Sequence, residues 1–249
     1  MSGPPAPEGC RYAADVSDAR SESPTDRQHP DNTTERLEIF SDGVIAIAIT
    51  LLVLDIKIPD AAPGKLFDAL LVHWPAYVAY VLSFTVIGIM WVSHHSMFER
   101  IRHVDRGLLF TNLLLLLGIG FLPFPTSLLA EYTKEGGSNS HVAAAVYSAT
   151  MAAIGLAFLA IWLYLSRHPD LLVEGVEPAN LRRSIRRSFV GPIVYTASIG
   201  LAFISAIACY FVYAAVAVYF IWGPSTRALL PGRGRAQVAN GEPPDASVD

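Results

Sequence analysis

Long apolar stretches separated by short polar segments dominate the hydrophobic pattern of the chain. They cover residues 36–57, 70–97, 107–130 and 141–166, and a last stretch covers 189–222. A helix that crosses a hydrocarbon core of about 30 Å needs about 20 apolar residues, and each stretch provides them. The last one would form a single helix of about 51 Å, so we divide it near residues 205–208. The pattern predicts an all-α membrane protein with six transmembrane helices.

Composition supports a membrane protein with polar tails. Hydrophobic residues make up 52% of the chain and charged residues 16%, whereas soluble domains carry about 25% charged residues. Residues 1–33 and 224–249 show no apolar periodicity, so we expect two disordered cytoplasmic tails around a membrane domain at 34–223. The first tail lacks the apolar segment of a signal peptide. Cys10 lies in this tail and Cys209 in an apolar stretch, so no disulfide is expected.

The basic residues are distributed unevenly between the two sides of a six-helix bundle. One side receives both termini and the second and fourth loops, which together carry every arginine, whereas the other side receives only Lys57, Lys65 and Lys134. This asymmetry follows the positive-inside rule. We therefore expect a multi-pass protein of the cell (inner) membrane with both termini in the cytoplasm. The basic stretch 181–187 is interpreted as an orienting segment near lipid headgroups rather than a nucleic-acid site.

The first apolar stretch has a bulky aliphatic face when it is drawn as a helix. At about 100° per residue, Ile47, Leu51 and Leu54 share one side with Phe40, and Thr50 flanks them. Thr50 carries the only hydroxyl between residues 43 and 54. A stripe of this kind is typical of a surface that faces lipid or the axis of an oligomer.

The opposite side of the same stretch is polar or small and carries Ser41, Asp42 and Ala46. A buried carboxylate needs partners, so we expect this side to face neighbouring helices. Arg36, Ser41 and Asp42 are then structural clamps for the helix rather than ion ligands. The candidate partners at the same depth are Trp91, His94, His95 and Asn112.

The adjacent histidines leave a second interpretation open. Their side chains point about 100° apart on a helix, so we predict no metal site. A proton relay through Asp42 and His94 or His95 is an alternative, because ionisable groups inside membranes are usually functional. An enzyme would need a nucleophile, an acid–base pair or a metal set facing a cavity. We find none outside this layer and predict no enzymatic activity.

Three motifs, in this order, resemble the transmembrane protein 175 family of potassium channels. The first is Arg-x-x-x-Phe-Ser-Asp at 36–42 followed by the aliphatic stripe, the second is Trp-Val-Ser-His-His at 91–95, and the third runs from Asn112 to Pro123-Phe-Pro125. The resemblance implies a six-helix subunit and, for a chain with one repeat, a homotetramer. The first helix of each subunit would line the central pore.

The resemblance also implies roles for residues of the first helix. Ile47 would form the narrowest constriction, with Leu51 and Leu54 at the next two inward positions, and Thr50 would join Ile47 in ion selection. The usual potassium filter Thr-Val-Gly-Tyr-Gly is absent. Gly-Ile-Gly at 118–120 lies inside an apolar run without a re-entrant loop, and the two prolines that follow are expected to kink or end that helix.

We therefore expect a potassium-selective, leak-type ion channel that needs no cofactor besides the permeant K⁺. Its expected partners are copies of itself and membrane lipids, and no nucleic acid. The alternative is a proton-conducting channel or a secondary transporter that uses Asp42 and His94 or His95. Transporters are often built from inverted repeats, and this chain shows no such repeat and no mid-span charge in its later helices.

Overall fold

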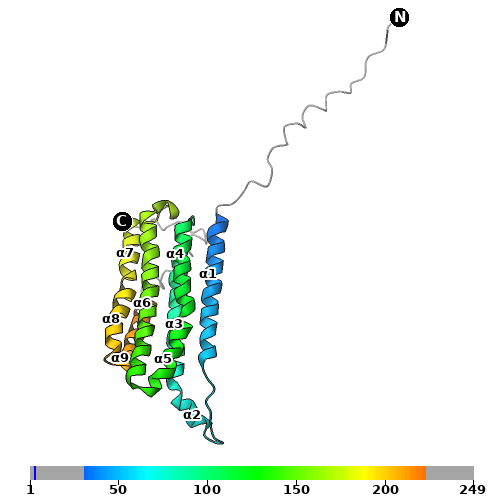
Figure 1. Ribbon diagram of the computed structural model, residues 1–249. Coiled ribbons are helices and arrows are strands. Elements are labelled where there is room, and N and C mark those ends of the chain that lie inside the picture. The colour runs from blue at the N-terminus through cyan, green and yellow to red at the C-terminus, as the bar shows by residue number, and fades with distance from the viewer. Residues whose placement is uncertain (1–2, 4–30, 223–249) are drawn as a thin grey trace, which may run out of the picture.

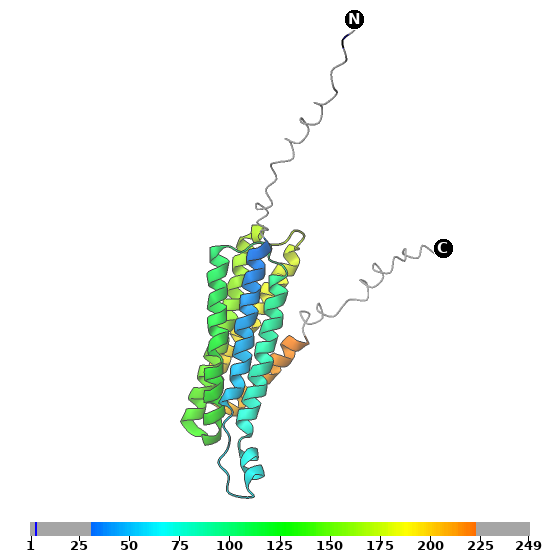
Figure 2. The same ribbon diagram turned by 90° about the vertical axis from the view of Figure 1, so that its right-hand side faces the viewer.

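The computed structural model describes Gly3 and residues 31–222, and the latter form a bundle of helices aligned along one axis (Figures 1 and 2). The prediction of an all-α fold is confirmed for these residues. In chain order the elements are α1 (Asp31–Leu51), the 3₁₀ helix η1 (Leu52–Asp55), α2 (Leu66–Val72), α3 (Trp74–Phe98), α4 (Arg106–Phe121), α5 (Pro123–Glu135), α6 (Gly137–Arg167), the 3₁₀ helix η2 (Pro169–Leu171), α7 (Pro178–Ser188), α8 (Val190–Ala202) and α9 (Ala206–Ile221).

Four helical runs among the described residues are long and apolar enough to cross a membrane. They are Thr33–Asp55, Trp74–Phe98, Arg106–Thr133 and Gly137–Arg167. The last apolar stretch is divided as predicted, because α8 ends at Ala202 and α9 begins at Ala206. With 13 and 16 residues, α8 and α9 are about 20 and 24 Å long. Both are shorter than a hydrocarbon core of about 30 Å.

Helix starts in the bundle follow ordinary capping chemistry. The Asp105 carboxylate accepts a hydrogen bond from the Leu108 N–H at the start of α4, and the Ser205 hydroxyl accepts one from the Ala208 N–H at the start of α9. Such side chains satisfy N–H groups that have no partner within the helix. Prolines occupy the first turns of α3, α5 and α7, where a missing N–H costs little.

The proline after α4 changes the helix without interrupting the span. α4 ends at Phe121 and α5 begins at Pro123, because proline cannot donate to the preceding turn. Leu122 between them keeps helical angles, with φ −58° and ψ −31°. The two helices therefore form one run, and the Gly-Ile-Gly segment lies inside α4 as expected rather than in a re-entrant loop.

Helix α6 is the centre of the bundle and contacts α4, α5, α7, α8 and α9. Two glycines allow close helix approaches there. A Cβ at Gly118 would lie 2.8 Å from Ile154 Cγ1, and a Cβ at Gly155 would lie 2.8 Å from Pro192 Cδ. Small residues at such crossings allow membrane helices to pack by van der Waals contact.

One end of the bundle, which we call the basic end, contains the start of α1, the end of α3 and all of α7 (Figure 1). Two loops pair there through an antiparallel bridge between Ile101 and Leu172. The Arg102 N–H donates to the Leu171 carbonyl at 2.8 Å, and the Val173 N–H donates to the Arg100 carbonyl at 3.0 Å. This pairing ties the α3–α4 connection to the α6–α7 connection.

Some predicted boundaries need correction. Residues 31–33, assigned to the first tail, begin α1, and residues 70–72, assigned to the second span, belong to α2. α7 was not predicted as a helix, because only Leu181 and Ile185 of its residues pack against the core. The rest of the predicted tails lies outside the described residues, Gly3 excepted. Cys209 is buried with a free thiol, and Cys10 lies outside the described residues.

Candidate functional site

Helix α1 presents a buried face and an exposed face to its surroundings. The buried side chains recur at spacings of three or four residues, which is the period of one helix face. This face packs against α3 and α4. Its members are Leu37, Ser41, Ile45, Ala48 and Leu52.

The aliphatic stripe expected from the sequence lies on the exposed face of α1 and η1. Ile47 is 60% exposed and Leu54 is 75% exposed, and Leu51 and Phe40 are exposed as well. The Thr50 hydroxyl donates to the Ile47 carbonyl at 2.9 Å. The hydroxyl proton of Thr50 is used in this hydrogen bond. The lone pairs of the exposed Thr50 oxygen face outward and can accept a hydrogen bond. The exposed face thus combines a bulky apolar ridge with a single hydroxyl oxygen, that of Thr50.

A buried hydrogen-bonded chain joins α1, α3 and α4 at the level of Ser41. The Asn112 side-chain amide donates to Ser41 Oγ at 2.9 Å, and Ser41 donates to the Leu37 carbonyl at 2.8 Å. His94 Nε2 lies 3.0 Å from Asn112 Oδ1. An amide oxygen only accepts, so His94 must donate from Nε2. Ser41, His94 and Asn112 are fully buried, and together they fix the depth of α1 against its neighbours.

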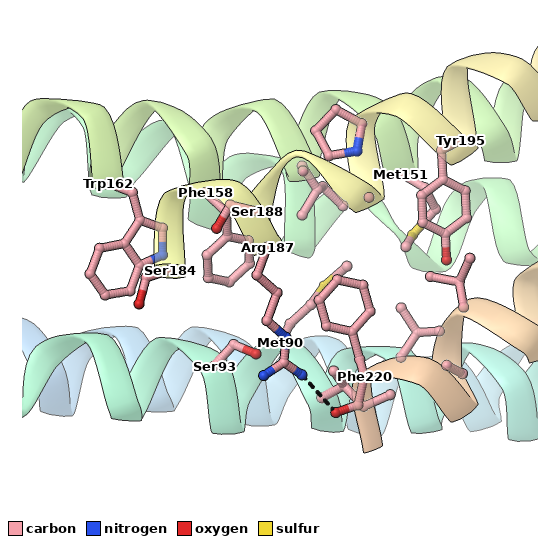
Figure 3. Close-up of a pocket in the computed structure, with 18 of the residues that line it drawn as sticks. Met90, Ser93, Met151, Phe158, Trp162, Ser184, Arg187, Ser188, Tyr195 and Phe220 are labelled. Atoms are coloured by element: carbon pink, nitrogen blue, oxygen red, sulfur yellow. Dashed lines mark hydrogen bonds between the residues drawn. The ribbon is translucent and has the colours of Figure 1, made fainter. Parts of the chain in front are cut away.

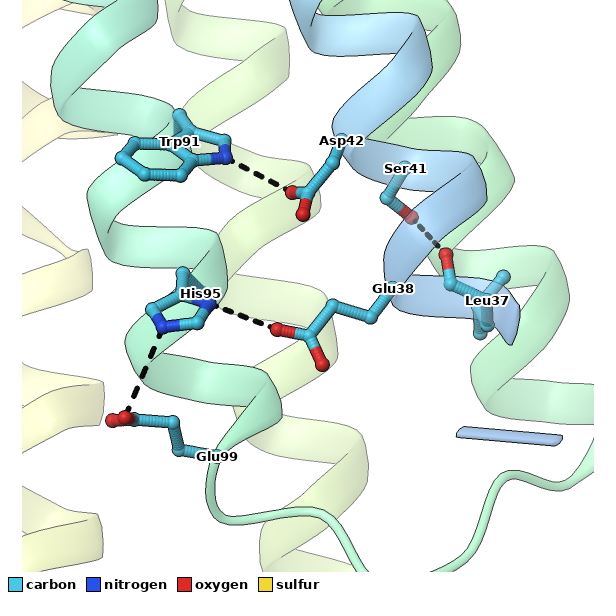
Figure 4. A network of polar contacts seen from close by, with 7 residues as sticks. All are labelled: Leu37, Glu38, Ser41, Asp42, Trp91, His95 and Glu99. Carbon is cyan, nitrogen blue, oxygen red and sulfur yellow. Dashed lines mark hydrogen bonds and ion pairs between the residues drawn. The ribbon is translucent and has the colours of Figure 1, made fainter. Parts of the chain in front are cut away.

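A second set of polar contacts lies at the edge of the α1–α3 interface. Figure 4 shows the Asp42 and Glu38 side chains pointing from α1 toward α3. The Trp91 indole N–H donates to Asp42 Oδ1 at 3.0 Å. His95 Nδ1 lies 2.8 Å from Glu38 Oε1, and its Nε2 lies 3.8 Å from Glu99 Oε1. The expected polar layer is therefore split into a buried chain around Ser41 and an outer ladder from Asp42 to Glu99.

Two side chains of the motif at 36–42 lie outside this network, on the exposed side of α1. Arg36 and Phe40 are exposed, and neither forms a side-chain hydrogen bond within the described part of the chain. At about 100° per residue, Arg36 falls within about 20° of Ile47, on the exposed side. Ala46 is exposed too, although it was expected to face neighbouring helices. The clamp within one subunit therefore consists of Ser41 and Asp42 with their partners on α3 and α4.

Two polar features of the bundle were not anticipated from the sequence. Glu38 precedes Asp42 by one helical turn, and this i, i+4 spacing places both carboxylates on the same side of α1. A buried hydroxyl cluster lies deeper in the bundle, where Ser83 Oγ is 2.9 Å from Thr126 Oγ1 and 3.2 Å from Tyr147 Oη. Single hydroxyls within apolar runs give no sequence signal of this pairing. Residues 31–222 contain no cluster of three His, Cys, Asp or Glu side chains that could hold a metal ion.

Comparison with known proteins points to one family of membrane channels. The family model described as "Endosomal/lysosomal potassium channel TMEM175" matches residues 36–123, which include most of α1 and all of α3 and α4. A potassium channel of Streptomyces collinus is 52% identical over 176 residues, which are 70% of this chain and 85% of that protein. The endosomal/lysosomal proton channel TMEM175 of Gallus gallus is 38% identical over 138 residues, which are 51% of this chain and 27% of that protein.

The fold has a solved counterpart as well. The crystal structure of a lysosomal potassium-selective channel TMEM175 homolog from Chamaesiphon minutus superimposes with a TM-score of 0.67. The two proteins are 38% identical, and the match covers 76% of this chain and 96% of that chain.

Proposed function

The chain belongs to the TMEM175 family of channels, and from this membership we propose that it is a potassium-selective, leak-type channel of the cell membrane. The proposed pore lies on the axis of a homotetramer and is lined by α1 of each subunit. The permeant ion is K⁺, no cofactor is required, and the partners are copies of the chain and membrane lipids. No enzymatic step is involved.

The two-faced α1 is the observation that supports this proposal most. The buried hydrogen bonds among Ser41, Asn112 and His94 fix how α1 is rotated against α3 and α4. The exposed aliphatic ridge of α1 can therefore point in only one direction. Four such ridges around an axis would form apolar rings at Ile47, Leu51 and Leu54, and rings of this kind can gate by losing water.

Selectivity in this proposal arises at Ile47 and Thr50. An ion that passes an aliphatic ring must lose part of its hydration shell, and K⁺ does so more readily than Na⁺ because it is larger. Thr50 lies less than one turn from Ile47, and its outward lone pairs can replace part of the lost water. The apolar ring thus sets the barrier, and the hydroxyl row lowers it for the ion that is easier to dehydrate.

The proposed topology has six spans with both termini in the cytoplasm. The four long runs supply four crossings, and α8 and α9 supply a shorter antiparallel pair (Figure 2). The basic end would face the cytoplasm, because arginines concentrate at its loops and on α7.

Planar bilayer recording of the purified protein under a K⁺ gradient tests the proposal. We expect Ile47→Asn to raise single-channel conductance several-fold, because an amide at the constriction keeps it hydrated. Ile193→Asn is the matched control, since Ile193 on α8 is 63% exposed and Ile47 is 60% exposed. Unchanged conductance in Ile47→Asn would contradict the proposal. Labelling of Ile47→Cys from the lipid only, with unaffected current, would contradict it as well.

Proton conduction is the second candidate function. The outer ladder supports it, because an imidazole lies between the carboxylates of Glu38 and Glu99 (Figure 4). The relatives from animals are named proton channels. Proton uptake by vesicles free of K⁺ and Na⁺ distinguishes the candidates. Uptake that is abolished in His95→Gln and retained in Ile193→Asn would favour proton conduction, and no uptake by the unmodified protein would exclude it.

A further inference from the structure

A cavity of about 150 Å³ lies on the side of the bundle that α1 does not touch. Side chains from α3, α6, α7, α8 and α9 line it, and the close-up in Figure 3 shows them converging on one space. A cavity of this volume can hold a group of about the size of benzene. A second hollow of about 200 Å³ adjoins it between α3 and α9 and shares Ile89, Ser93 and Phe220 with it. The two together form a site longer than either alone.

The cavity is polar at one end and apolar at the other. Trp162 and Ser184 lie at the end toward the basic loops, and Met151 and Tyr195 lie at the far end (Figure 3). Arg187 extends across the space between them and donates to the Phe220 carbonyl at 3.1 Å. The guanidinium of Arg187 also lies over the Phe220 ring, 5.2 Å from its centroid.

The polar end contains side-chain hydrogen-bond donors that lack some of the partners they could bind. Arg100 lies 5.6 Å from the Trp162 ring centroid and 3.5 Å from Ser184 Oγ, and it forms no ion pair with any carboxylate in the described part of the chain. Ser96 lines the cavity, is only 7% exposed, and its hydroxyl has no hydrogen-bond partner. Buried polar groups are nearly always paired, so an unpaired donor beside uncompensated positive charge indicates a missing anionic ligand.

We propose that this cavity binds an anionic phospholipid from the leaflet that surrounds the basic end. The headgroup phosphate lies between Arg100 and Arg187 and accepts from Ser96, and part of one acyl chain occupies the apolar end and the adjoining hollow. Arginine suits phosphate because its planar fork donates two parallel hydrogen bonds. A ligand with both a charged head and an apolar chain matches the two ends, and a membrane bundle meets such molecules at high concentration. The site is separate from the α1 surface and does not depend on which ion the channel conducts.

Binding can be measured on the purified, delipidated full-length protein in a neutral detergent. The readout is the thermal unfolding midpoint during titration with phosphatidylglycerol, and native mass spectrometry counts the lipid that stays bound. We expect phosphatidylglycerol to raise the midpoint, and phosphatidylcholine and sodium phosphate to leave it unchanged. An equal shift with phosphatidylcholine, whose phosphate is offset by its choline cation, would show that the net negative charge of the lipid is not recognised and would overturn the proposal. An equal shift with phosphate would identify a free anion site and overturn the lipid assignment.

Two variants locate the site. Arg187→Gln and its neighbour Arg186→Gln remove the same charge from α7, but only Arg187 lines the cavity. We expect the apparent Kd for phosphatidylglycerol to rise about tenfold or more in Arg187→Gln and to stay unchanged in Arg186→Gln. Arg100→Gln should weaken binding similarly. If loss of the Phe220 contact prevents Arg187→Gln from folding, Arg100→Gln is the variant that tests the proposal. Equal affinities in all variants would overturn the proposal.

Discussion

At the scale of single residues, Asn112 has the most demanding role in the clamp on α1. Its amide nitrogen donates to Ser41, and its amide oxygen accepts from His94. No other side-chain type of its size supplies a donor and an acceptor in this arrangement. Because all three residues are fully buried, a missing partner cannot be replaced by bulk water.

Asn112→Leu should therefore destabilise the protein. It leaves the His94 Nε2–H without an acceptor, which costs about 1–3 kcal/mol for a buried group. The measurement is the thermal unfolding midpoint in detergent. Thr111→Val is the control on the same helix, because the Thr111 hydroxyl bonds only to the Gly107 carbonyl of its own helix. Equal midpoints for the two variants would mean that the buried chain does not hold α1 in place.

Thr50→Val should lower selectivity for K⁺ over Na⁺ without preventing assembly. Valine keeps the volume and removes the oxygen that faces outward beside Ile47. Under bi-ionic K⁺/Na⁺ conditions, the reversal potential should shift toward zero. Thr85→Val is matched to it, since Thr85 is also a helix threonine that bonds to its own backbone, at Val81. If the reversal potential of Thr50→Val stayed that of the unmodified channel, the apolar rings alone would set selectivity.

At the scale of elements, the start of α4 depends on Asp105. Its carboxylate caps the helix through the Leu108 N–H at 2.8 Å and accepts from the Tyr164 hydroxyl of α6. Burial raises the pKa of the Asp105 carboxyl, but the hydrogen bonds from Tyr164 and Leu108 outweigh it and leave that pKa below its ordinary value. One side chain thus joins a helix start to the central helix.

Asp105→Ala should lower stability by about 0.5–2 kcal/mol, the usual cost of losing a helix cap. The folded-state pKa is lowered, so the ionised carboxylate contributes stability above its unfolded value of about 3.9. That contribution is lost as pH falls through the folded-state pKa. The difference in unfolding midpoint between the unmodified protein and Asp105→Ala should therefore shrink below about pH 4. A difference that stayed constant to low pH would show that the charge has no role.

The parts of the fold that could be predicted are those that local chemistry determines. Pro123 ends α4 because it cannot donate a hydrogen bond to the preceding turn, and the 189–222 stretch is too long for one crossing. The ridge of Ile47 follows from helical periodicity alone. The pairing of His95 with Glu38 and the convergence of Arg100 and Arg187 depend on helix packing, which one sequence does not reveal. Arg36 was misplaced because the motif grouped it with Ser41 and Asp42, although its helical angle puts it beside Ile47.

At the scale of the whole molecule, the proposed pore and the proposed lipid site lie on different sides of one bundle. The α1 ridge is exposed in the single subunit, and none of the described residues of α1 lines the cavity among α3, α6, α7, α8 and α9. Helix α3 lies between the two surfaces, because it contacts α1 and also lines the cavity. The exposed stripe of α1 and the cavity share no residue, so substitutions in one surface should leave the other intact.

The proposed tetramer can be tested by crosslinking. In a background with Cys10→Ser and Cys209→Ser, Ile47→Cys would place thiols around the common axis of that tetramer. A short bifunctional thiol reagent should link subunits in pairs, visible as covalent dimers on a denaturing gel. Ile193→Cys in the same background should give monomers, since α8 faces away from the axis in this arrangement. Dimers from Ile193→Cys but not from Ile47→Cys would place the axis elsewhere.

The exposed ridge of α1 also has a consequence for heredity and expression. In the proposed tetramer each subunit would contribute one side chain to every ring, so no subunit would enclose a conduction path by itself. A cell that makes equal amounts of unmodified and Ile47-substituted chains would assemble mostly mixed channels. Their conductance would follow the altered member of the ring, and a single defective gene copy would therefore act dominantly over an intact one.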